Sequence, residues 1–308
     1  MHRTIELTVP AGSAPPLIAA LRDIGGVIGV VLQPGASVMP EGDVVTIHTL
    51  NRAADDVLRA AERVCGASAL SVVTSEVASI TDAKHQHLID HDVDEAVWEE
   101  LETGLRHQGR ITTNYLALMA LGGVIGAAGA VAEPGVALVA YVASAVVAPG
   151  FEPVAKLPLG MVLRRGEVFS AGLLSSLAGY AVLILAAAAA WFALAALSEL
   201  TPDKFLNGDA LKHTLDPSGD IIATAIAGAF AGAVILASYR RSVIAGALVA
   251  MRLIEAASVA GVALALGRLD LVAAALQRLG LDVAFVVAAG LLVFGAKQAL
   301  VHRRRPLR

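Results

Sequence analysis

The feature that most constrains this chain is a series of long apolar segments that begins near residue 111. Six such segments follow one another, at about 111–131, 135–149, 168–197, 220–239, 242–267 and 282–301. A helix that crosses the hydrocarbon core of a bilayer needs roughly 20 mainly apolar residues. Residues 111–308 are therefore predicted to form a polytopic all-α membrane domain of about six spans. The second segment is short, so it is either a broken helix or one that continues, kinked, to about residue 163.

The residues before this point have the opposite character. Residues 1–110 hold 16 acidic and 8 basic side chains, whereas residues 111–308 hold 11 and 15. Charged residues make up 16% of the whole chain, against roughly 25% in an average soluble domain. A single soluble fold is thereby excluded, and the pattern indicates an acidic, water-soluble head on a membrane body. An acidic head also argues against nucleic acid as a partner, because phosphate binding needs a basic face.

The head, residues 1–80, has the βαββαβ order of an α+β ferredoxin-like fold. Pro15-Pro16 marks the start of one helix, and Asn51 is expected to cap a second. Four strands are expected, at residues 3–9, 27–35, 42–50 and 67–77. The order resembles that of the small amino-acid-binding domains of the ACT-like kind, which implies a ligand-sensing role. A folded head that only docks to its own copy is the alternative.

Residues 81–110 are predicted to form an acidic, amphipathic connector helix. Its apolar residues recur at helical spacing: Val93, Val97, Trp98, Leu101 and Leu105. Just before them, His87 and His91 are four residues apart, so both rings would share one helix face, as metal ligands can. Two ligands on an exposed helix do not close a metal site, so a solvated polar linker is the favoured interpretation. No metal or other cofactor is expected.

Arginine and lysine predict the orientation of the spans. One set of segment ends carries Arg106, Arg110, Arg164, Arg165, Arg240, Arg241, Arg303, Arg304, Arg305 and Arg308, and the other carries Lys204, Lys212, Arg268 and Arg278. The first set is cytoplasmic by the positive-inside rule. The start of the chain lacks the apolar core of a signal peptide. We therefore expect a multi-pass protein of the cell inner (plasma) membrane with both termini in the cytoplasm. One cysteine, Cys65, fits a reducing compartment.

Two glycine pairs suggest an internal repeat. Gly122 and Gly126 lie in the first apolar segment, and Gly228 and Gly232 lie in the fourth. Three spans per repeat would place the two halves in opposite topology, as in many secondary transporters. The membrane domain can thus be interpreted as two inverted three-helix repeats. Close helix packing or dimerisation is the plainer interpretation of such glycine spacing.

Ionisable residues inside the apolar segments are the candidate transport site. Arg252 is near the middle of its segment, with Glu255 three residues later. An arginine at that depth costs roughly 2.5–3.5 kcal/mol on insertion scales, so it needs a partner, a water-filled cavity or a substrate. Glu152 and Lys156 are four residues apart, and we expect them to meet Arg252 and Glu255 from the opposite half. An internal ion-pair network that only fixes helix packing is the alternative.

Prolines surround the second candidate pair. Pro149, Pro153 and Pro158 remove three backbone donors within ten residues. Non-helical backbone at membrane depth is tolerated where it is buried in protein or lines a cavity. The break beside Glu152 therefore has the ingredients of a small ion or anion site, although a re-entrant turn without a ligand has the same pattern. Asn114 and Tyr115, at the start of the first span, are candidate partners for freed backbone groups, although interfacial anchoring explains Tyr115 equally well.

The residues around this break resemble a known family. The relevant positions are Trp98 in the acidic connector, Asn114-Tyr115-Leu116 at the entry to the first span, and Ala148, Pro149 and Pro153 at the break. Over roughly residues 90–250, this pattern is similar to that of the prokaryotic hydrophobic membrane proteins catalogued as domain of unknown function 389. Many members carry two adjacent prolines in the fifth span, where this chain has Arg252-Leu253-Ile254-Glu255. The resemblance implies a membrane protein with a soluble head and no established activity.

The leading hypothesis is a homo-oligomeric, and most simply dimeric, transporter or channel-like protein. A ligand bound at the head would regulate it, such as an amino acid or a nucleotide, cyclic dinucleotides included. The candidate ligand-binding residues of the head are Arg3, Arg22, Gly35, Arg52 and Arg59. The alternative is a non-transporting, membrane-anchored sensor or scaffold. An enzyme ranks last, because the spans hold no histidine to act as a base and the chain has no P-loop or dinucleotide fingerprint.

Overall fold

The computed structural model describes residues 2–198, 200–238 and 243–301. It divides into two compact units. The first comprises the residues up to Leu101 together with the end of the chain from Ala299, and the second is Glu102–Gln298. Four of the arginines that predict the orientation, at positions 303–305 and 308, lie outside the described residues, as do Arg240 and Arg241.

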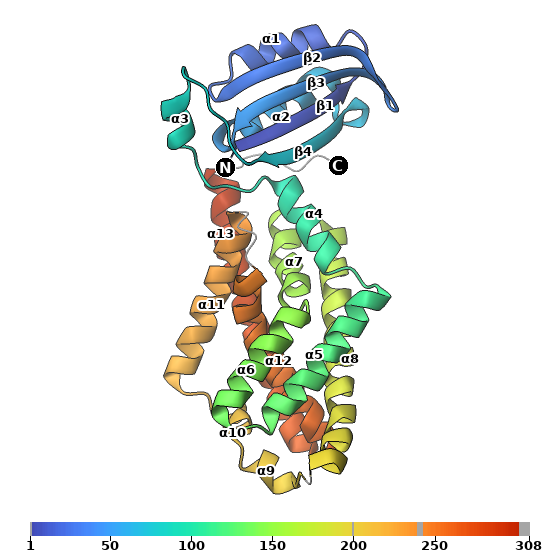
Figure 1. The fold of residues 1–308 in the computed structure, drawn as a ribbon, viewed down its shortest axis with the longest axis vertical. Helices are drawn as coiled ribbons and strands as arrows, with labels where there is room; N and C mark the ends of the chain where they lie inside the picture. The colour runs from blue at the N-terminus through green and yellow to red at the C-terminus, as the bar shows by residue number, and fades with distance from the viewer. Residues whose placement is uncertain (1, 199, 239–242, 302–308) are drawn as a thin grey trace. The chain divides into compact units, whose positions relative to one another are not determined.

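The first unit contains the predicted four-stranded sheet (Figure 1). Its elements are β1 (His2–Val9), α1 (Ala14–Arg22), β2 (Val27–Val38), β3 (Glu41–Leu50), α2 (Asn51–Cys65), η1 (Ala67–Ala69), β4 (Ser71–Val77) and α3 (Gln86–Asp90). The strand order is β2-β3-β1-β4, and all neighbouring strands are antiparallel. A split βαβ arrangement gives this order, which is consistent with the ferredoxin-like expectation.

The head has its own hydrophobic core on one face of this sheet. Alternate residues of β1 and β3 point to the same side and meet the apolar faces of α1 and α2. The buried residues include Ile5, Leu7, Val9, Leu17, Leu21, Val45, Ile47, Val57 and Leu58. Full burial of a side chain of this size contributes about 1.5–3 kcal/mol. The alternating pattern of β1 therefore accounts for both the sheet and the position of its helices.

The connector is less helical than predicted. Its helix, α4 (Trp98–Gln108), begins six residues after Asp92. The residues before it cannot continue the helix, because their polar groups are bonded to the head: the backbone carbonyl groups of Val93 and Glu95 accept hydrogen bonds from Asn51 and Arg3. Val97 joins the core of the head.

The second unit is a helical bundle. Its helices are α5 (Thr113–Ala130), α6 (Pro134–Val147), α7 (Phe151–Val162), α8 (Gly166–Ser198), α9 (Pro202–Leu206), α10 (Asp209–Leu215), α11 (Gly219–Ala237), α12 (Val243–Ala265) and α13 (Leu269–Leu300). The short helices α9 and α10 lie at one end of the bundle (Figure 1). We call this unit the body.

Six spans are not confirmed. Within the described part of the chain, α5, α8, α11 and α13 are long and apolar enough to cross a membrane. The pair α6 and α7, bent by 56°, adds a fifth span if it counts as one. The short second segment is thus one half of a bent pair, as the proline pattern predicts. The side chains of residues 243–249, at the start of α12, lie outside the described part.

The body is apolar outside and carries charges inside. α12 packs against α5, α6, α8 and α11, and its residues Leu253 and Ile254 are at most 1% exposed. In contrast, Leu185 and Phe192 of α8 and Leu292 of α13 are each more than 60% exposed. Apolar surfaces of this extent mark a membrane environment or an interaction surface. Together with the length of the helices, they indicate a membrane protein.

Three glycines of α5 allow neighbouring helices to approach closely. A Cβ atom on Gly122 would meet Ala148, one on Gly123 would meet the backbone of Leu183, and one on Gly126 would meet Ser258. In α11, a Cβ atom on Gly228 would meet nothing within 4 Å. The glycine pair of α5 therefore serves packing within the chain, and α11 does not reproduce it at Gly228. An inverted repeat is not confirmed.

Candidate functional site

Four charged side chains lie inside the body on α12 and α13. In α12, Nη1 of Arg252 lies 2.8 Å from Oε2 of Glu255. In α13, Nε of Arg278 donates a hydrogen bond to Asp282 at 3.0 Å, and Nη2 lies 2.9 Å from the other carboxylate oxygen. Glu255, Arg278 and Asp282 are 8%, 7% and 4% exposed. We call these four residues the α12–α13 charge cluster.

The two pairs act on one another. Asp282 interacts electrostatically with Arg252 as well as with Arg278, and also with Glu255. At 1.5 Å per residue, Arg252 is at least about 13 Å from either end of α12, and Asp282 at least about 19 Å from either end of α13. Two positive and two negative charges therefore balance deep inside the bundle.

Several buried donors around this cluster have no partner. Nε of Arg252, Nη1 of Arg278, the Tyr141 hydroxyl and the Ser258 hydroxyl form no hydrogen bond with the described residues. Tyr141 interacts electrostatically with Glu255. A buried polar group without a partner costs about 1–3 kcal/mol, and such groups are uncommon in folded proteins. These donors are suited to a bound solute or to water.

The predicted meeting of Glu152 and Lys156 with the α12 pair is wrong. Lys156, 4% exposed, donates a hydrogen bond from Nζ to the Gly109 carbonyl oxygen at 2.7 Å. That carbonyl follows the end of α4, where a cation is favourable. Lys297 does the same at the end of α11, since its Nζ donates to the Ala237 carbonyl oxygen at 2.6 Å. Buried lysines thus cap helix ends in this body.

Glu152 lies in the first turn of α7, directly after the break. Its carboxylate is half-buried, and no described residue forms an ion pair with it. Tyr115 and Tyr180 both lie within electrostatic reach of it. An acidic side chain at this place is favourable because the N-terminus of a helix carries partial positive charge.

Tyrosines satisfy the backbone around the break at Pro149. The Tyr180 hydroxyl donates a hydrogen bond to the Gly150 carbonyl oxygen at 3.1 Å, and the Tyr115 hydroxyl donates to the Ser175 carbonyl oxygen at 2.7 Å. Tyr180 also interacts electrostatically with Asp282, which connects the break to the charge cluster. Asn114, in contrast, is exposed in the first turn of α5. Tyr180 therefore bonds the backbone at the break, where the sequence suggests Asn114 and Tyr115.

At the end of the body opposite α9 and α10, Glu102 joins two segments through ion pairs. Its carboxylate forms ion pairs with Arg106 of α4 and with Arg165, which follows α7. Those arginines of the predicted cytoplasmic set that the structure describes lie at this end. Lys204 and Lys212 belong to α9 and α10.

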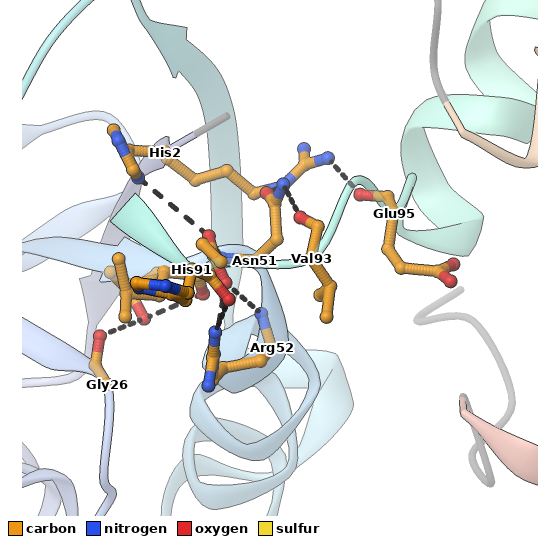
Figure 2. A network of polar contacts seen from close by, with 11 residues as sticks. His2, Gly26, Asn51, Arg52, His91, Val93 and Glu95 are labelled. Atoms are coloured by element: carbon orange, nitrogen blue, oxygen red, sulfur yellow. Dashed lines mark hydrogen bonds and ion pairs between the residues drawn. The ribbon is translucent and has the colours of Figure 1, made fainter. Parts of the chain in front are cut away.

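Two of the predicted ligand-binding arginines of the head are held by other residues (Figure 2). Arg3 is 2% exposed; its Nε donates to Asn51 at 2.7 Å, its Nη2 to the Glu95 carbonyl oxygen at 2.8 Å, and it pairs with Glu100. Arg52 donates from Nε to Asp92 at 3.2 Å and from Nη2 to the His91 carbonyl oxygen. Both arginines therefore fasten the connector to the head.

Asp92 is the residue of this network that the sequence does not single out. Its carboxylate accepts hydrogen bonds from the backbone N–H groups of Asn51 at 2.7 Å and Arg52 at 3.3 Å. These are first-turn donors, which have no partner within a helix. The predicted cap by Asn51 is therefore wrong: Asn51 is the first residue of α2, and a carboxylate 41 residues away supplies the cap.

The remaining candidates of the head do not gather in one place. Arg22 is exposed in the last turn of α1, and Arg59 pairs with Asp56 on α2. Gly35, with φ of +62°, lies in the long β2–β3 hairpin, where its N–H donates to Asp43 at 2.8 Å. Ligand binding by these residues remains a prediction.

The two histidines of the connector contact each other. The His87 and His91 rings stack with centroids 4.5 Å apart, and Nδ1 of His91 lies 2.9 Å from the His87 carbonyl oxygen. Among the described residues, no three His, Cys, Asp or Glu side chains are grouped as a metal site requires. Helix α3 ends at Asp90, so His91 is not on a continuous helix face.

Comparison with known proteins finds one family that part of the body resembles. Residues 145–288 match the model of a family described as Domain of unknown function (DUF389). No curated protein and no solved structure matches the chain. The match extends from the last residues of α6 into α13, so it contains the break, α7 and the whole charge cluster. It begins after Trp98 and Asn114, which the motif-based resemblance includes. Through residues 145–288, this chain is similar to the DUF389 family.

Proposed function

We propose that the body is a transporter or channel-like protein in which small charged solutes cross the bilayer by way of the α12–α13 charge cluster. The observation that carries this proposal is the burial of Glu255, Arg278 and Asp282, with the half-buried Arg252 paired to Glu255, in a body whose helices expose apolar residues. Ionisable groups are costly in a membrane and are found where ions, protons or substrates pass. A body that only anchored the head would not need them, because well-packed apolar residues can replace a buried ion pair without loss of stability.

The bent pair supports the same proposal. Broken helices occur at the binding sites of secondary transporters, where half-helix ends face the solute. Here the break places the N-terminus of α7 and the Glu152 carboxylate beside Tyr180, and Tyr180 also lies within electrostatic reach of Asp282. The break and the charge cluster thus belong to one polar region.

Ion flux into reconstituted vesicles tests the proposal. The full-length protein in proteoliposomes is mixed with iso-osmotic salts of different cations and anions, and swelling is followed by light scattering. We expect faster swelling than in protein-free vesicles for at least one salt. Arg252→Gln is expected to abolish the difference, because it removes a charge from the cluster. Arg268→Gln is the matched control, since Arg268 is 45% exposed and pairs with Asp270.

The result that would overturn the proposal is equally clear. Wild-type protein that is folded and monodisperse, yet swells no faster than empty vesicles in any salt, would make the body an anchor. Equal rates for wild type and Arg252→Gln would show that the cluster has no part in the flux.

We also propose that the head binds a small ligand, an amino acid or a nucleotide such as a cyclic dinucleotide, and thereby regulates a dimeric body. Both helices contact one face of the sheet, whereas Thr46 and His48 on the other face are partly exposed. Thermal unfolding of the full-length protein with a panel of these ligands tests this, since a ligand that binds only the folded state raises Tm. A panel without any shift would contradict it.

The Glu102 end of the body is proposed to face the cytoplasm of a bacterial-type inner membrane. The apolar segments at the Glu102 end are flanked by Arg106, Arg110, Arg164 and Arg165, and arginines next to a span favour the cytoplasmic side. Protease should then cleave the head in inverted membrane vesicles and leave it intact in sealed right-side-out vesicles. The reverse pattern would contradict the orientation.

A further inference from the structure

We propose that the α12–α13 charge cluster binds an oxyanion, such as sulfate, phosphate or a carboxylate, in the place that the Asp282 carboxylate occupies against Arg278. This inference rests on the proposed function and names the chemical class of its solute. In the structure, the Asp282 carboxylate is bonded to Arg278 and lies within electrostatic reach of Arg252. It is therefore an internal oxyanion that is bound by one guanidinium group and interacts electrostatically with a second.

The unmet hydrogen-bonding capacity of the cluster consists mainly of donors. Arg278, 7% exposed, has no acceptor for Nη1 among the described residues, and Arg252 has none for Nε. The buried hydroxyl groups of Tyr141 and Ser258 are also without partners. A solute that brings acceptor oxygens to Arg278 would satisfy its Nη1 group, whereas a cation would leave that group unbonded.

Guanidinium groups favour oxyanions over spherical anions. Their N–H groups form a planar fork that matches two oxygens of a carboxylate, sulfate or phosphate at once. Arg278 already binds Asp282 with both Nε and Nη2 directed at the carboxylate. An external oxyanion can therefore replace that carboxylate without a change in the geometry of the arginine.

Charge balance requires that a proton be taken up when an external oxyanion replaces the Asp282 carboxylate. The cluster is neutral as it stands, so an added anion would leave a displaced carboxylate charged in a buried site, which is strongly unfavourable. A proton taken up by the displaced carboxylate restores the balance for a monovalent oxyanion and offsets one of the two charges of sulfate. Asp282 interacts electrostatically with Arg278 on its own helix, with Arg252 and Glu255 on α12, and with Tyr180 on α8. Glu255 interacts electrostatically with Arg252, Asp282, Tyr141 on α6 and His213 on α10. Oxyanion binding should accordingly strengthen as the pH falls.

Binding of radiolabelled sulfate to the full-length protein in detergent tests the inference, with phosphate, acetate and chloride as competitors at constant ionic strength. We expect sulfate to be displaced by phosphate and acetate more readily than by chloride. Asp282→Asn is expected to bind sulfate about tenfold more tightly and with less dependence on pH, because it removes the competing negative charge. If the cluster only holds helices together, Asp282→Asn should not bind sulfate more tightly than wild type.

Two further variants keep the test decisive. Arg278→Leu/Asp282→Leu removes a complete pair, so the fold should remain while sulfate binding is lost; Arg268→Gln should bind as wild type does. Binding that is equal in wild type and in the double leucine variant would mean an adventitious site and would overturn the inference. If the swelling assay shows that only cations cross, the oxyanion inference is wrong although the proposed transport stands.

Discussion

The Arg278→Leu variant is expected to lose about 3–5 kcal/mol of stability, since it leaves the Asp282 carboxylate buried without its main partner. Asp282 is 4% exposed, and Arg278 supplies the ion-pair hydrogen bond that its carboxylate makes in the described structure. The change should appear as a large fall in Tm in detergent and as a low yield of monodisperse protein.

Removing both partners should reverse most of this loss. In Arg278→Leu/Asp282→Leu no charge is left unpaired, and leucines of similar volume can pack against the apolar residues beside them. We expect a Tm close to that of wild type together with the loss of ion flux. A single variant as stable as wild type would contradict the buried ion pair. A double variant as unstable as the single one would show that the site needs charges for folding itself.

Gly123→Ala is expected to be the most damaging single-methyl change in the body. The added Cβ would meet the backbone of α8, with the Leu183 carbonyl carbon 3.0 Å and the Ala187 nitrogen 3.2 Å away. Backbone atoms cannot move aside as a side chain can, so α5 and α8 would have to separate. Overpacking of this kind costs about 1–3 kcal/mol, measured as a fall in Tm.

Gly228→Ala is the matched control for this prediction. Gly228 also lies within a long apolar helix, but its Cβ would meet nothing within 4 Å. Alanine is a better helix former than glycine by about 1 kcal/mol, so Tm should stay unchanged or rise slightly. Equal effects of the two alanines would mean that α5 and α8 do not approach as closely as described.

The sequence predicts the head well because its signals are local. The alternation of residues 3–9 defines β1, and the apolar faces of the two helices define the core. The exception is the connector. Helical spacing from Val93 onward predicts a helix there, but Asp92 and the carbonyl groups after it bond to α2 and Arg3 instead. Such tertiary partners leave no periodic signal.

The body is predicted in outline only, because hydropathy locates apolar segments but not helix ends. The last segment, predicted from residue 282, begins at Leu269 in α13. The start of this helix contains Arg278 and Asp282, whose charges lower its average hydropathy. As a result, the sequence assigns Arg278 to a membrane surface, whereas the structure buries it.

The sequence predicts one of the two ion pairs of the candidate site and misses the other. Arg252 and Glu255 pair as their three-residue spacing suggests. Their partners do not come from Glu152 and Lys156 but from α13, and the four-residue spacing of Arg278 and Asp282 is the signal that would have found them. The unpartnered hydroxyl groups of Tyr141 and Ser258 depend on three-dimensional packing, which one sequence does not reveal.

The most direct test of the central claim is whether water and solutes reach the charge cluster. In a Cys65→Ser background, Val286→Cys places a thiol one turn from Asp282 on the buried face of α13, and Val262→Cys places one in the apolar core of the body. The two valines are 4% and 0% exposed. We predict that a charged methanethiosulfonate modifies Val286→Cys in proteoliposomes, that sulfate slows this reaction, and that Val262→Cys is not modified. If Val286→Cys is as unreactive as Val262→Cys, the cluster is sealed and solutes do not pass through it.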